Sequence, residues 1–251
     1  MIVSMKTGSF EEALAALGVT CDTLTDEERT RLDELGFLIL PGVVDSPWLE
    51  QMRSAFEQLA TQDRQEGRRQ GGTRHVEALQ YRSRDFDRIM IYPKLLAAAY
   101  HILQAPFRCN GLDGRDPLGG HGLQGLHSDS WARSPGQPFH IINSLWLLDN
   151  FISENGATRI VPGSHTCTGR LPRAAADPNQ AYPGEVIVTA PAGSALIFNG
   201  HLLHGGTRNQ SGLSRRVVRC GFEPREARGS FGAESSSVPD GIPTAARFLF
   251  E

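Results

Sequence analysis

The chain has 251 residues, of which 39% are hydrophobic, and a formal net charge of −3, so it is long enough to bury a sizeable core. The nearly balanced charge gives no electrostatic reason to expect binding to nucleic acid or to an anionic membrane. Four scattered cysteines without a C-x-x-C motif indicate reduced thiols, and no segment has the roughly 18 apolar residues of a membrane span. The N-terminus also lacks a basic region followed by an apolar run. We therefore expect a soluble, cytoplasmic protein.

The first hundred residues are predicted to be mainly helical. Thr25 and Glu28 have the spacing of a capping box, which predicts a helix that ends at Gly36. Ser46 precedes a proline and is predicted to cap the next helix, because proline is favoured at the first helical position. Further elements predicted in this part are helices at 10–17 and 94–103 and a strand at 37–40.

Two segments are predicted to be loops. Residues 62–72 are polar and glycine-rich, which indicates a mobile loop. Residues 111–125 contain six glycines, and we interpret them as a loop over a site, since glycine permits backbone conformations closed to other residues. Between 63 and 88, seven arginines stand against five acidic residues. We interpret this region as a solvated surface in preference to a patch for a phosphate-bearing substrate such as a CoA ester.

The second half of the chain has the pattern of a β protein. Strand-like runs at 141–150, 185–189 and 194–198, with glycine and proline between them, favour a closed or double-sheet architecture. Neither a repeat nor a linker composition is present, so we expect a single domain spanning 1–251. Its predicted parts are a helical region at about 10–105, a β core at about 107–225 and a polar tail at 226–251.

The segment Gln124-Gly-Leu-His-Ser-Asp-Ser-Trp131 contains a candidate metal site. Residues two apart in an extended segment face the same side, so His127 and Asp129 would present an imidazole and a carboxylate together. A third ligand from another strand would complete a 2-His-1-carboxylate triad, which binds one face of a non-haem Fe(II). His204 is the candidate, and His201 in the same Gly-His-Leu-Leu-His-Gly segment competes with it. An H-x-D motif alone is weak evidence for a metal site, so the interpretation depends on the motifs elsewhere in the sequence.

That pattern resembles the phytanoyl-CoA dioxygenase-like family of Fe(II)/2-oxoglutarate oxygenases. The similarity comprises the H-x-D motif, the His-Gly-Gly at 204 with Asn209 five residues later, and Arg215 eleven residues after His204. It also includes the segments Glu-Asn-Gly-Ala-Thr at 154–158 and Val-Pro-Gly-Ser-His at 161–165. The resemblance extends from about residue 25 to about residue 222 and includes the strand that follows Gly36.

The resemblance implies a double-stranded β-helix, or cupin-like jelly roll, with the N-terminal helices packed on one sheet. It assigns His127, Asp129 and His204 as the Fe(II) ligands and Arg215 as the partner of the distal carboxylate of 2-oxoglutarate. A planar guanidinium suits that carboxylate. Arg216 and Arg219 are alternative anchors, and Arg219 is the more serious one because it shares the strand face of Arg215. The eleven-residue step favours His204, because the same step from His201 reaches a glycine. Further residues predicted to contact 2-oxoglutarate are Ser144, Gln124 and Trp146.

The implied activity is a dioxygenase reaction that uses O2, converts 2-oxoglutarate to succinate and CO2, and oxidises a small-molecule metabolite, as in secondary metabolism. Halogenating relatives lack the carboxylate that Asp129 provides, so chlorination is disfavoured and hydroxylation is the default outcome. Desaturation, ring closure and epimerisation are left open, because only the substrate geometry separates them from hydroxylation. A homo-oligomer is left open. The alternatives are a non-oxidative cupin-type isomerase and an inactive ligand-binding module. Among neighbouring residues, His201 and His165 are expected to be structural, Asn209 to fix a turn, and Trp131 and Phe139 to line the pocket or pack in the core.

Overall fold

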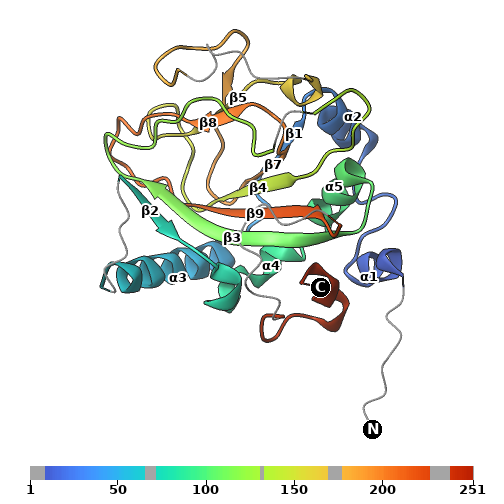
Figure 1. Cartoon of the computed structure of the whole chain (residues 1–251). Coiled ribbons are helices and arrows are strands. Elements are labelled where there is room, and N and C mark those ends of the chain that lie inside the picture. Colours follow the sequence, from blue (N-terminus) through green and yellow to red (C-terminus); the bar gives the residue numbers. More distant parts are fainter. Residues whose placement is uncertain (1–8, 66–71, 131–132, 169–176, 227–237, 251) are drawn as a thin grey trace.

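The computed structural model describes residues 9–65, 72–130, 133–168, 177–226 and 238–250. Two sheets built from antiparallel strands lie one above the other, and helices cover the outer face of the larger sheet (Figure 1). The larger sheet has the order β1-β7-β4-β9-β3-β2 and the smaller one β6-β5-β8. The prediction of a double-sheet β core with helices packed on one sheet is confirmed. The strands are β1 Phe37–Leu40, β2 Thr73–Val76, β3 Phe107–Pro117, β4 Ile142–Leu147, β5 Thr158–Ile160, β6 Val186–Ile187, β7 Ala195–Asn199, β8 His204–Gly206 and β9 Val217–Pro224.

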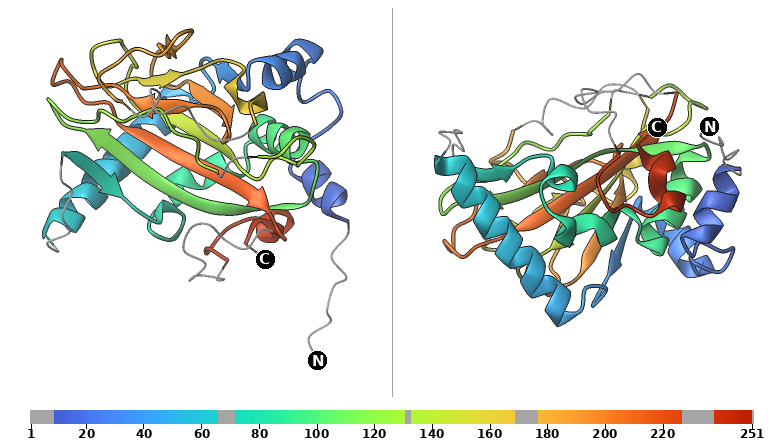
Figure 2. Two further views of the ribbon diagram at one scale, coloured as in Figure 1. Left: turned by 45° about the horizontal axis from the view of Figure 1, so that its top comes forward. Right: turned by 90° about the horizontal axis from the view of Figure 1, so that it is seen from below.

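The helices come mainly from the N-terminal part of the chain, as predicted. The view from below shows α3 running across the face of the larger sheet (Figure 2). None of the helices in the described part of the chain is both long and apolar enough to cross a membrane. The helices are α1 Phe10–Ala16, α2 Asp26–Glu34, α3 Ser46–Gln65, α4 Asp87–Met90 and α5 Pro93–Leu103, with short 3-10 turns at Leu79–Tyr81, Arg84–Phe86, Ser164–Thr166 and Thr244–Leu249.

Helix starts follow the local sequence, with one correction. The predicted capping box before α2 is present, because the Glu28 amide donates to Thr25 Oγ1 at 3.1 Å and the Thr25 amide donates to Glu28 Oε2 at 2.9 Å. The cap of α3 is Asp45 and not Ser46. Asp45 Oδ1 accepts from the Trp48 amide at 2.9 Å, and the helix already includes Ser46. A carboxylate one residue earlier therefore satisfies the free amide of the first turn.

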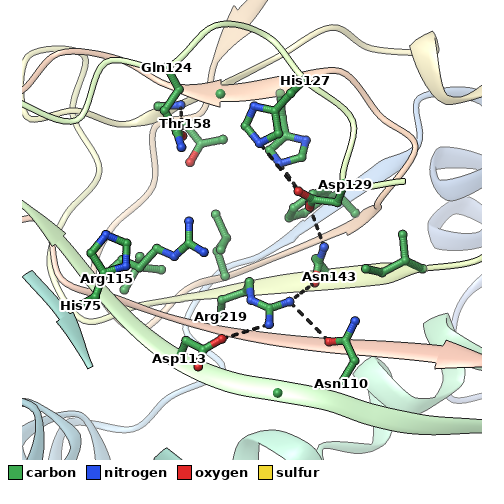
Figure 3. Close-up of a pocket in the computed structure, with 18 of the residues that line it drawn as sticks. His75, Asn110, Asp113, Arg115, Gln124, His127, Asp129, Asn143, Thr158 and Arg219 are labelled. Atoms are coloured by element: carbon green, nitrogen blue, oxygen red, sulfur yellow. Dashed lines mark hydrogen bonds and ion pairs between the residues drawn. The ribbon is translucent and has the colours of Figure 1, made fainter. Parts of the chain in front are cut away.

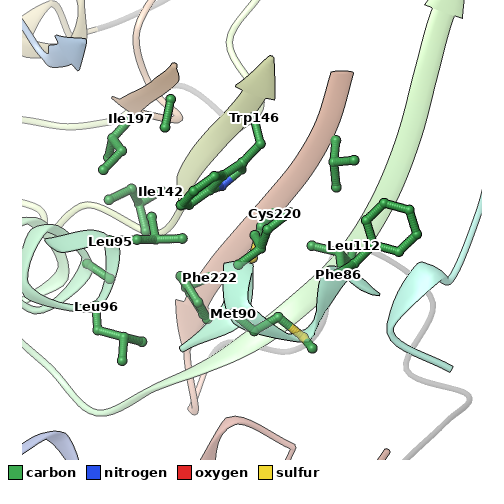
Figure 4. Packing of buried hydrophobic residues seen from close by; sticks show 14 of the residues in the cluster. Phe86, Met90, Leu95, Leu96, Leu112, Ile142, Trp146, Ile197, Cys220 and Phe222 are labelled. Atoms are coloured by element: carbon green, nitrogen blue, oxygen red, sulfur yellow. The ribbon is translucent and has the colours of Figure 1, made fainter. Parts of the chain in front are cut away.

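The main hydrophobic core lies between the helices and the larger sheet. Leu95 and Leu96 of α5 pack towards Ile142, Trp146 and Phe222 on strands β4 and β9 (Figure 4). The apolar stripe of α3 joins the same cluster through Met52 and Phe56, and both side chains are fully buried. Because one face of the larger sheet is buried against the helices, the side chains of alternate residues lie on its other face, which is directed towards the smaller sheet.

Strand β3 corrects the interpretation of 111–125 as a loop over the site. The segment continues as strand up to Pro117, and only the residues after it form a loop. Gly111 has a φ of +135° where the register of β3 against β9 shifts, which is the position of a β-bulge. Gly114 lies so close to α3 that a Cβ would approach the Phe56 ring to 2.6 Å. These two glycines therefore serve strand geometry and helix packing.

Candidate metal and cosubstrate site

The three predicted metal ligands meet between the two sheets. His127 and His204 form an isolated antiparallel bridge in which each amide donates to the other carbonyl at 2.9 Å. The Asp129 amide donates to the Gly200 carbonyl at 2.8 Å, so the H-x-D segment runs alongside the chain that leads into β8. One ligand atom from each of the three side chains lies within 4.8 Å of the other two. Residues 77 positions apart in sequence are thus brought together as a ligand cluster.

Backbone carbonyl groups fix the orientation of both imidazoles. Nδ1 of His127 lies 3.0 Å from the Gly125 carbonyl, and Nδ1 of His204 lies 2.9 Å from the Leu202 carbonyl. A carbonyl only accepts, so each Nδ1 carries the hydrogen, and in the neutral ring each Nε2 has a lone pair for a metal. Both Nε2 atoms face Asp129, at 3.6 Å for His127 and 3.3 Å for His204. This is the arrangement in which imidazoles bind a metal.

The charges of the cluster suit a divalent cation. Burial would raise the pKa of Asp129, but His204, His127 and Arg219 outweigh it and lower that pKa to about 2. Burial and the neighbouring His204 lower the pKa of His127. Burial also acts to lower the pKa of His204, yet the adjacent Asp129 carboxylate raises it. Near neutral pH the site therefore presents an ionised carboxylate beside a neutral His127.

A hydrogen-bonded chain supports the Asp129 carboxylate from below (Figure 3). Asn143 on β4 donates from Nδ2 to Asp129 Oδ2 at 2.7 Å. Its Oδ1 accepts from Arg219 Nη1 at 2.8 Å, and Arg219 Nη2 donates to Asp113 Oδ2 at 3.0 Å. Because Arg219 can only donate, it fixes the orientation of the Asn143 amide. Sequence reasoning missed Asn143, and Arg219, the alternative anchor, already has partners.

The cluster opens into a cavity of about 540 Å³, and Arg215 lines it. Arg215 is 7% exposed, and its guanidinium lies 4.9 Å from the centre of the Phe151 ring. Burial, opposed by Asp116 and reinforced by Arg115, lowers the pKa of Arg215 to about 10. Within the described residues this guanidinium forms neither a hydrogen bond nor an ion pair, and its Nε is buried without a partner. Arg215 is therefore a sheltered cation available to an anionic ligand.

Two more residues line the cavity beside the ligand cluster. Gln124 was predicted to contact the cosubstrate, and its Oε1 accepts from the Gly206 amide at 2.9 Å, so the side chain binds β8 to the H-x-D segment. Thr158 on β5 is buried and lines the same cavity, but sequence reasoning missed it. Its register opposite Gly206, two residues from the pair Ile160 and His204, places it on the face of the metal ligand.

Ser144 and Trp146 were expected to contact 2-oxoglutarate, but both side chains lie on the face of the sheet away from the cavity. Ser144 donates from Oγ to the Cys220 carbonyl at 3.0 Å and accepts from Trp146 Nε1 at 3.1 Å, so both side chains lie in the buried core on the helix-covered face. Trp146 packs edge-on against Tyr92 with ring centres 5.2 Å apart. The neighbours of odd parity on β4, Asn143 and Leu145, face the cavity instead.

The neighbouring residues have mainly structural contacts. His201 accepts at Nε2 from the His140 amide at 3.2 Å and is not part of the ligand cluster. His165 Nε2 lies 3.1 Å from the Asp33 carbonyl. Asn209 fixes its turn as predicted, donating to the Pro117 and Leu213 carbonyls and accepting from the Gly212 amide. Phe139 packs between His165 and His201, whereas Trp131 lies outside the described residues.

Comparison with known proteins identifies the family. The model of the family "Phytanoyl-CoA dioxygenase (PhyH)" matches residues 32–217, which is well over half of the chain. The chain belongs to the phytanoyl-CoA dioxygenase family. Relatives include the dioxygenase trt7 of Aspergillus terreus, 34% identical over 167 residues that cover 61% of this chain and 56% of that protein. The Fe(II)/2-oxoglutarate-dependent dioxygenase nvfF of Aspergillus novofumigatus is 32% identical over 50% of this chain and 43% of its own length. The chain thus spans about half the length of these family members.

Solved structures in the family's fold class resemble this chain closely. HygX from Streptomyces hygroscopicus, determined with nickel, 2-oxoglutarate and hygromycin B bound, has a TM-score of 0.68 at 24% identity, covering 82% of this chain and 90% of HygX. The 2-oxoglutarate-dependent carbocyclase SnoK from nogalamycin biosynthesis has a TM-score of 0.65 at 20% identity, covering 82% and 86%. At these identities the likeness supports the jelly-roll fold.

Proposed function

We propose that this protein is a non-haem Fe(II)- and 2-oxoglutarate-dependent dioxygenase that hydroxylates, or otherwise oxidises, a small-molecule metabolite. The observation that carries the proposal is the cluster of His127, Asp129 and His204, whose ligand atoms all lie within 4.8 Å of one another. Two imidazoles and one carboxylate are the donor set of a facial triad, which leaves metal positions free for a cosubstrate and O2. The relatives named as dioxygenases support the same activity.

The donor chemistry of the site fits Fe(II). The Nε2 lone pairs of His127 and His204 face the carboxylate, and carbonyl groups hold the opposite ring nitrogens. When bound, Fe(II) and 2-oxoglutarate would supply the oxidising chemistry with O2, with succinate and CO2 as co-products. The protein's part is to hold the ligands, to orient Asp129 through Asn143, and to enclose the reaction in the cavity.

The available guanidinium of Arg215 supports a site for 2-oxoglutarate beside the cluster. A guanidinium binds a carboxylate through two parallel hydrogen bonds, and a buried one without a partner gains most from such a ligand. Arg219 is a weaker candidate, because its guanidinium already donates to Asp113 and Asn143. We assign Gln124 and Thr158 to the same subsite, since both line the cavity near His204. Arg215 therefore has the role of cosubstrate anchor in this proposal.

A small metabolite suits the cavity better than an acyl-CoA. Arginines of the segment 63–88 are engaged in ion pairs, Arg74 with Glu57 and Asp116 and Arg82 with Asp63. Solved structures of this fold include one with hygromycin B bound and others from nogalamycin biosynthesis, which supports oxidation of secondary metabolites. We also propose a cytoplasmic location, which is supported by four cysteines that are free thiols.

The test is anaerobic titration of Fe(II) and 2-oxoglutarate into the protein, followed by an assay of succinate release after O2 is admitted. We expect a charge-transfer absorption that depends on both additions, and slow succinate release without a substrate. His204→Ala should abolish the absorption and His201→Ala should preserve it, which gives a matched pair three residues apart.

Two other results would point to the alternatives. Metal binding without any 2-oxoglutarate-dependent absorption would favour a cupin-type isomerase. The absorption without succinate release from 2-oxoglutarate would favour an inactive binding module. Either result contradicts the proposed activity.

A further inference from the structure

Three guanidinium groups share the cavity face of the larger sheet. Strand β3 pairs with β9 so that Asp113 lies opposite Arg219 and Arg115 lies opposite Val217. Side chains opposite each other on antiparallel strands lie on the same face, and so do residues two apart. Arg115, Arg215 and Arg219 therefore all point to the same side, and all three line the cavity. Figure 3 shows the Arg115 side chain directed from β3 into this space.

Arg219 has bonding partners in the structure and Arg215 has a proposed ligand, whereas Arg115 has no assigned partner. Arg219 has Asp113 at 3.0 Å and Asn143 at 2.8 Å, and Arg215 is assigned to 2-oxoglutarate. Among the described residues, Arg115 has no ion pair or hydrogen bond at its guanidinium, and its Nε is buried without a partner. Its neighbour across the sheet is His75 of β2, which burial and Arg115 itself keep below its ordinary pKa. A second guanidinium thus lies in the cavity without a hydrogen bond or ion pair to the described part of the chain.

Binding of Fe(II) and 2-oxoglutarate does not supply Arg115 with a negative charge to pair with. Fe(II), the Asp129 carboxylate, the doubly charged 2-oxoglutarate and the Arg215 guanidinium together carry no net charge, and Arg219 cancels Asp113. Glu77 also lines the cavity, but it is exposed, and its carboxylate is not within ion-pair distance of Arg115. An uncompensated charge in a sheltered position is unfavourable unless a ligand pairs with it. One positive charge remains for the substrate.

We propose that the substrate is a carboxylic acid whose carboxylate binds Arg115. The inference rests on the proposed function, because it assumes that 2-oxoglutarate occupies Arg215. A single guanidinium matches the geometry and the single charge of a carboxylate, whereas a doubly charged phosphate would need a further cation. The cavity of about 540 Å³ has room for a small acid beside the cosubstrate. Arg115 would then fix which end of the substrate lies away from the metal.

A rival assignment gives Arg115 to 2-oxoglutarate. Arg115 and Arg215 also line a second, smaller cavity of about 230 Å³ together, so both guanidinium groups could hold one cosubstrate carboxylate. The two assignments differ in which ligand loses affinity when Arg115 is replaced. The variants are Arg115→Gln, Arg115→Lys and Arg215→Gln. The control is Arg208→Gln, which removes an exposed arginine that donates to the Gly120 carbonyl outside the cavity.

The first measurement is the dissociation constant of 2-oxoglutarate, from the Fe(II)-dependent absorption under anaerobic conditions. We expect Arg115→Gln to stay within about threefold of the parent protein, while Arg215→Gln weakens binding by at least about thirtyfold, as expected when one partner of a sheltered charge pair is removed. Weakening of 2-oxoglutarate binding by Arg115→Gln to the same extent overturns the proposal and supports the rival. If even the parent protein shows no 2-oxoglutarate-dependent absorption, the proposed function has failed, and that outcome is separate.

The second measurement tests the carboxylate directly on protein loaded with Ni(II) and 2-oxoglutarate. Binding of benzoic and hexanoic acids and of their primary amides is compared by saturation-transfer NMR. We expect the parent protein and Arg208→Gln to prefer the acids, Arg115→Gln to lose that preference by about tenfold or more, and Arg115→Lys to retain part of it. Equal binding of acids and amides to the parent protein, or no binding of the acids, overturns the proposal. Circular dichroism confirms that each variant is folded.

Discussion

Replacement of Arg215 by methionine should stabilise the ligand-free protein while it weakens 2-oxoglutarate binding. Arg215 is 7% exposed, and within the described residues its guanidinium has no hydrogen-bond or ion-pair partner. Methionine has an unbranched side chain of similar length up to the guanidinium, which lies over the Phe151 ring, and the Arg215 amide that donates to Asp116 at 2.8 Å is unchanged. The substitution therefore removes a buried charge and its contact with the Phe151 ring, but no hydrogen bond or ion pair of the guanidinium within the described residues.

The magnitude follows from the pKa of Arg215, which burial lowers to about 10. Because the folded-state pKa lies below the unfolded value, the charged side chain destabilises the fold at every pH below about 10, and the penalty fades as the pH rises through that value. At neutral pH the penalty is on the order of 3 kcal/mol. Loss of the charge-assisted partner should weaken 2-oxoglutarate binding by about 2–5 kcal/mol, or roughly 30- to 5,000-fold.

The assay is urea unfolding of the metal-free protein, together with 2-oxoglutarate titration of the Fe(II)-loaded protein without O2. Arg215→Met should raise the free energy of unfolding. Arg219→Met is the matched control and should lower it by about 1–3 kcal/mol, because Asp113 and Asn143 lose their partner. The reasoning is refuted if Arg215→Met destabilises the metal-free protein as Arg219→Met does, or if it leaves 2-oxoglutarate affinity unchanged.

Three further predictions concern the site and its supports. Metal affinity should fall on acidification as His204 protonates, and the fall should start above the ordinary histidine pKa because Asp129 raises the pKa of His204. The Asp129 carboxylate, with its pKa of about 2, stays ionised over this range. Co(II) titrations between about pH 5 and 8 check this, and an affinity that is constant over the range would contradict it. Ser144→Ala should leave 2-oxoglutarate affinity unchanged and cost about 1 kcal/mol of stability, measured by urea unfolding, and a large loss of affinity would restore its predicted role. Gly206→Ala should weaken Fe(II) and 2-oxoglutarate binding together, because its Cβ would lie 2.5 Å from the Gly122 carbonyl oxygen and 3.2 Å from Gln124 Oε1 and push β8 away from the chain that leads to His127. Anaerobic titrations with both ligands measure this, and unchanged binding would contradict it.

The local pattern of the sequence was sufficient to predict the types of metal ligand and many of the helices and strands. The H-x-D motif brings His127 and Asp129 to one side of an extended segment by geometry alone. The capping box at Thr25 likewise depends on contacts within one helical turn. The choice of His204 over His201 came from spacing to Arg215, and the structure places His204 in the ligand cluster. Such features are local, so neighbouring residues suffice to specify them.

Tertiary structure decided what depends on strand parity and register. The sequence could not show that Ser144 and Trp146 face the helices while Asn143 faces the cavity, because a shift of one residue exchanges the two faces of β4. The glycines of 111–125 suggested a loop because their roles depend on other elements. The bulge at Gly111 arises where β3 pairs with β9, and the contact of Gly114 with Phe56 arises where α3 packs on β3.

Charge pairing across the chain was also beyond the sequence. In the sequence Arg115, Arg215 and Arg219 cannot be told apart chemically. The folded sheet pairs Arg219 with Asp113 and Asn143, and it leaves the guanidinium groups of the other two without a hydrogen bond or ion pair to any described residue. The sequence by itself thus determined which groups could bind a metal and a carboxylate. The fold decided which of them are free to do so, because burial and pairing depend on residues distant in the chain.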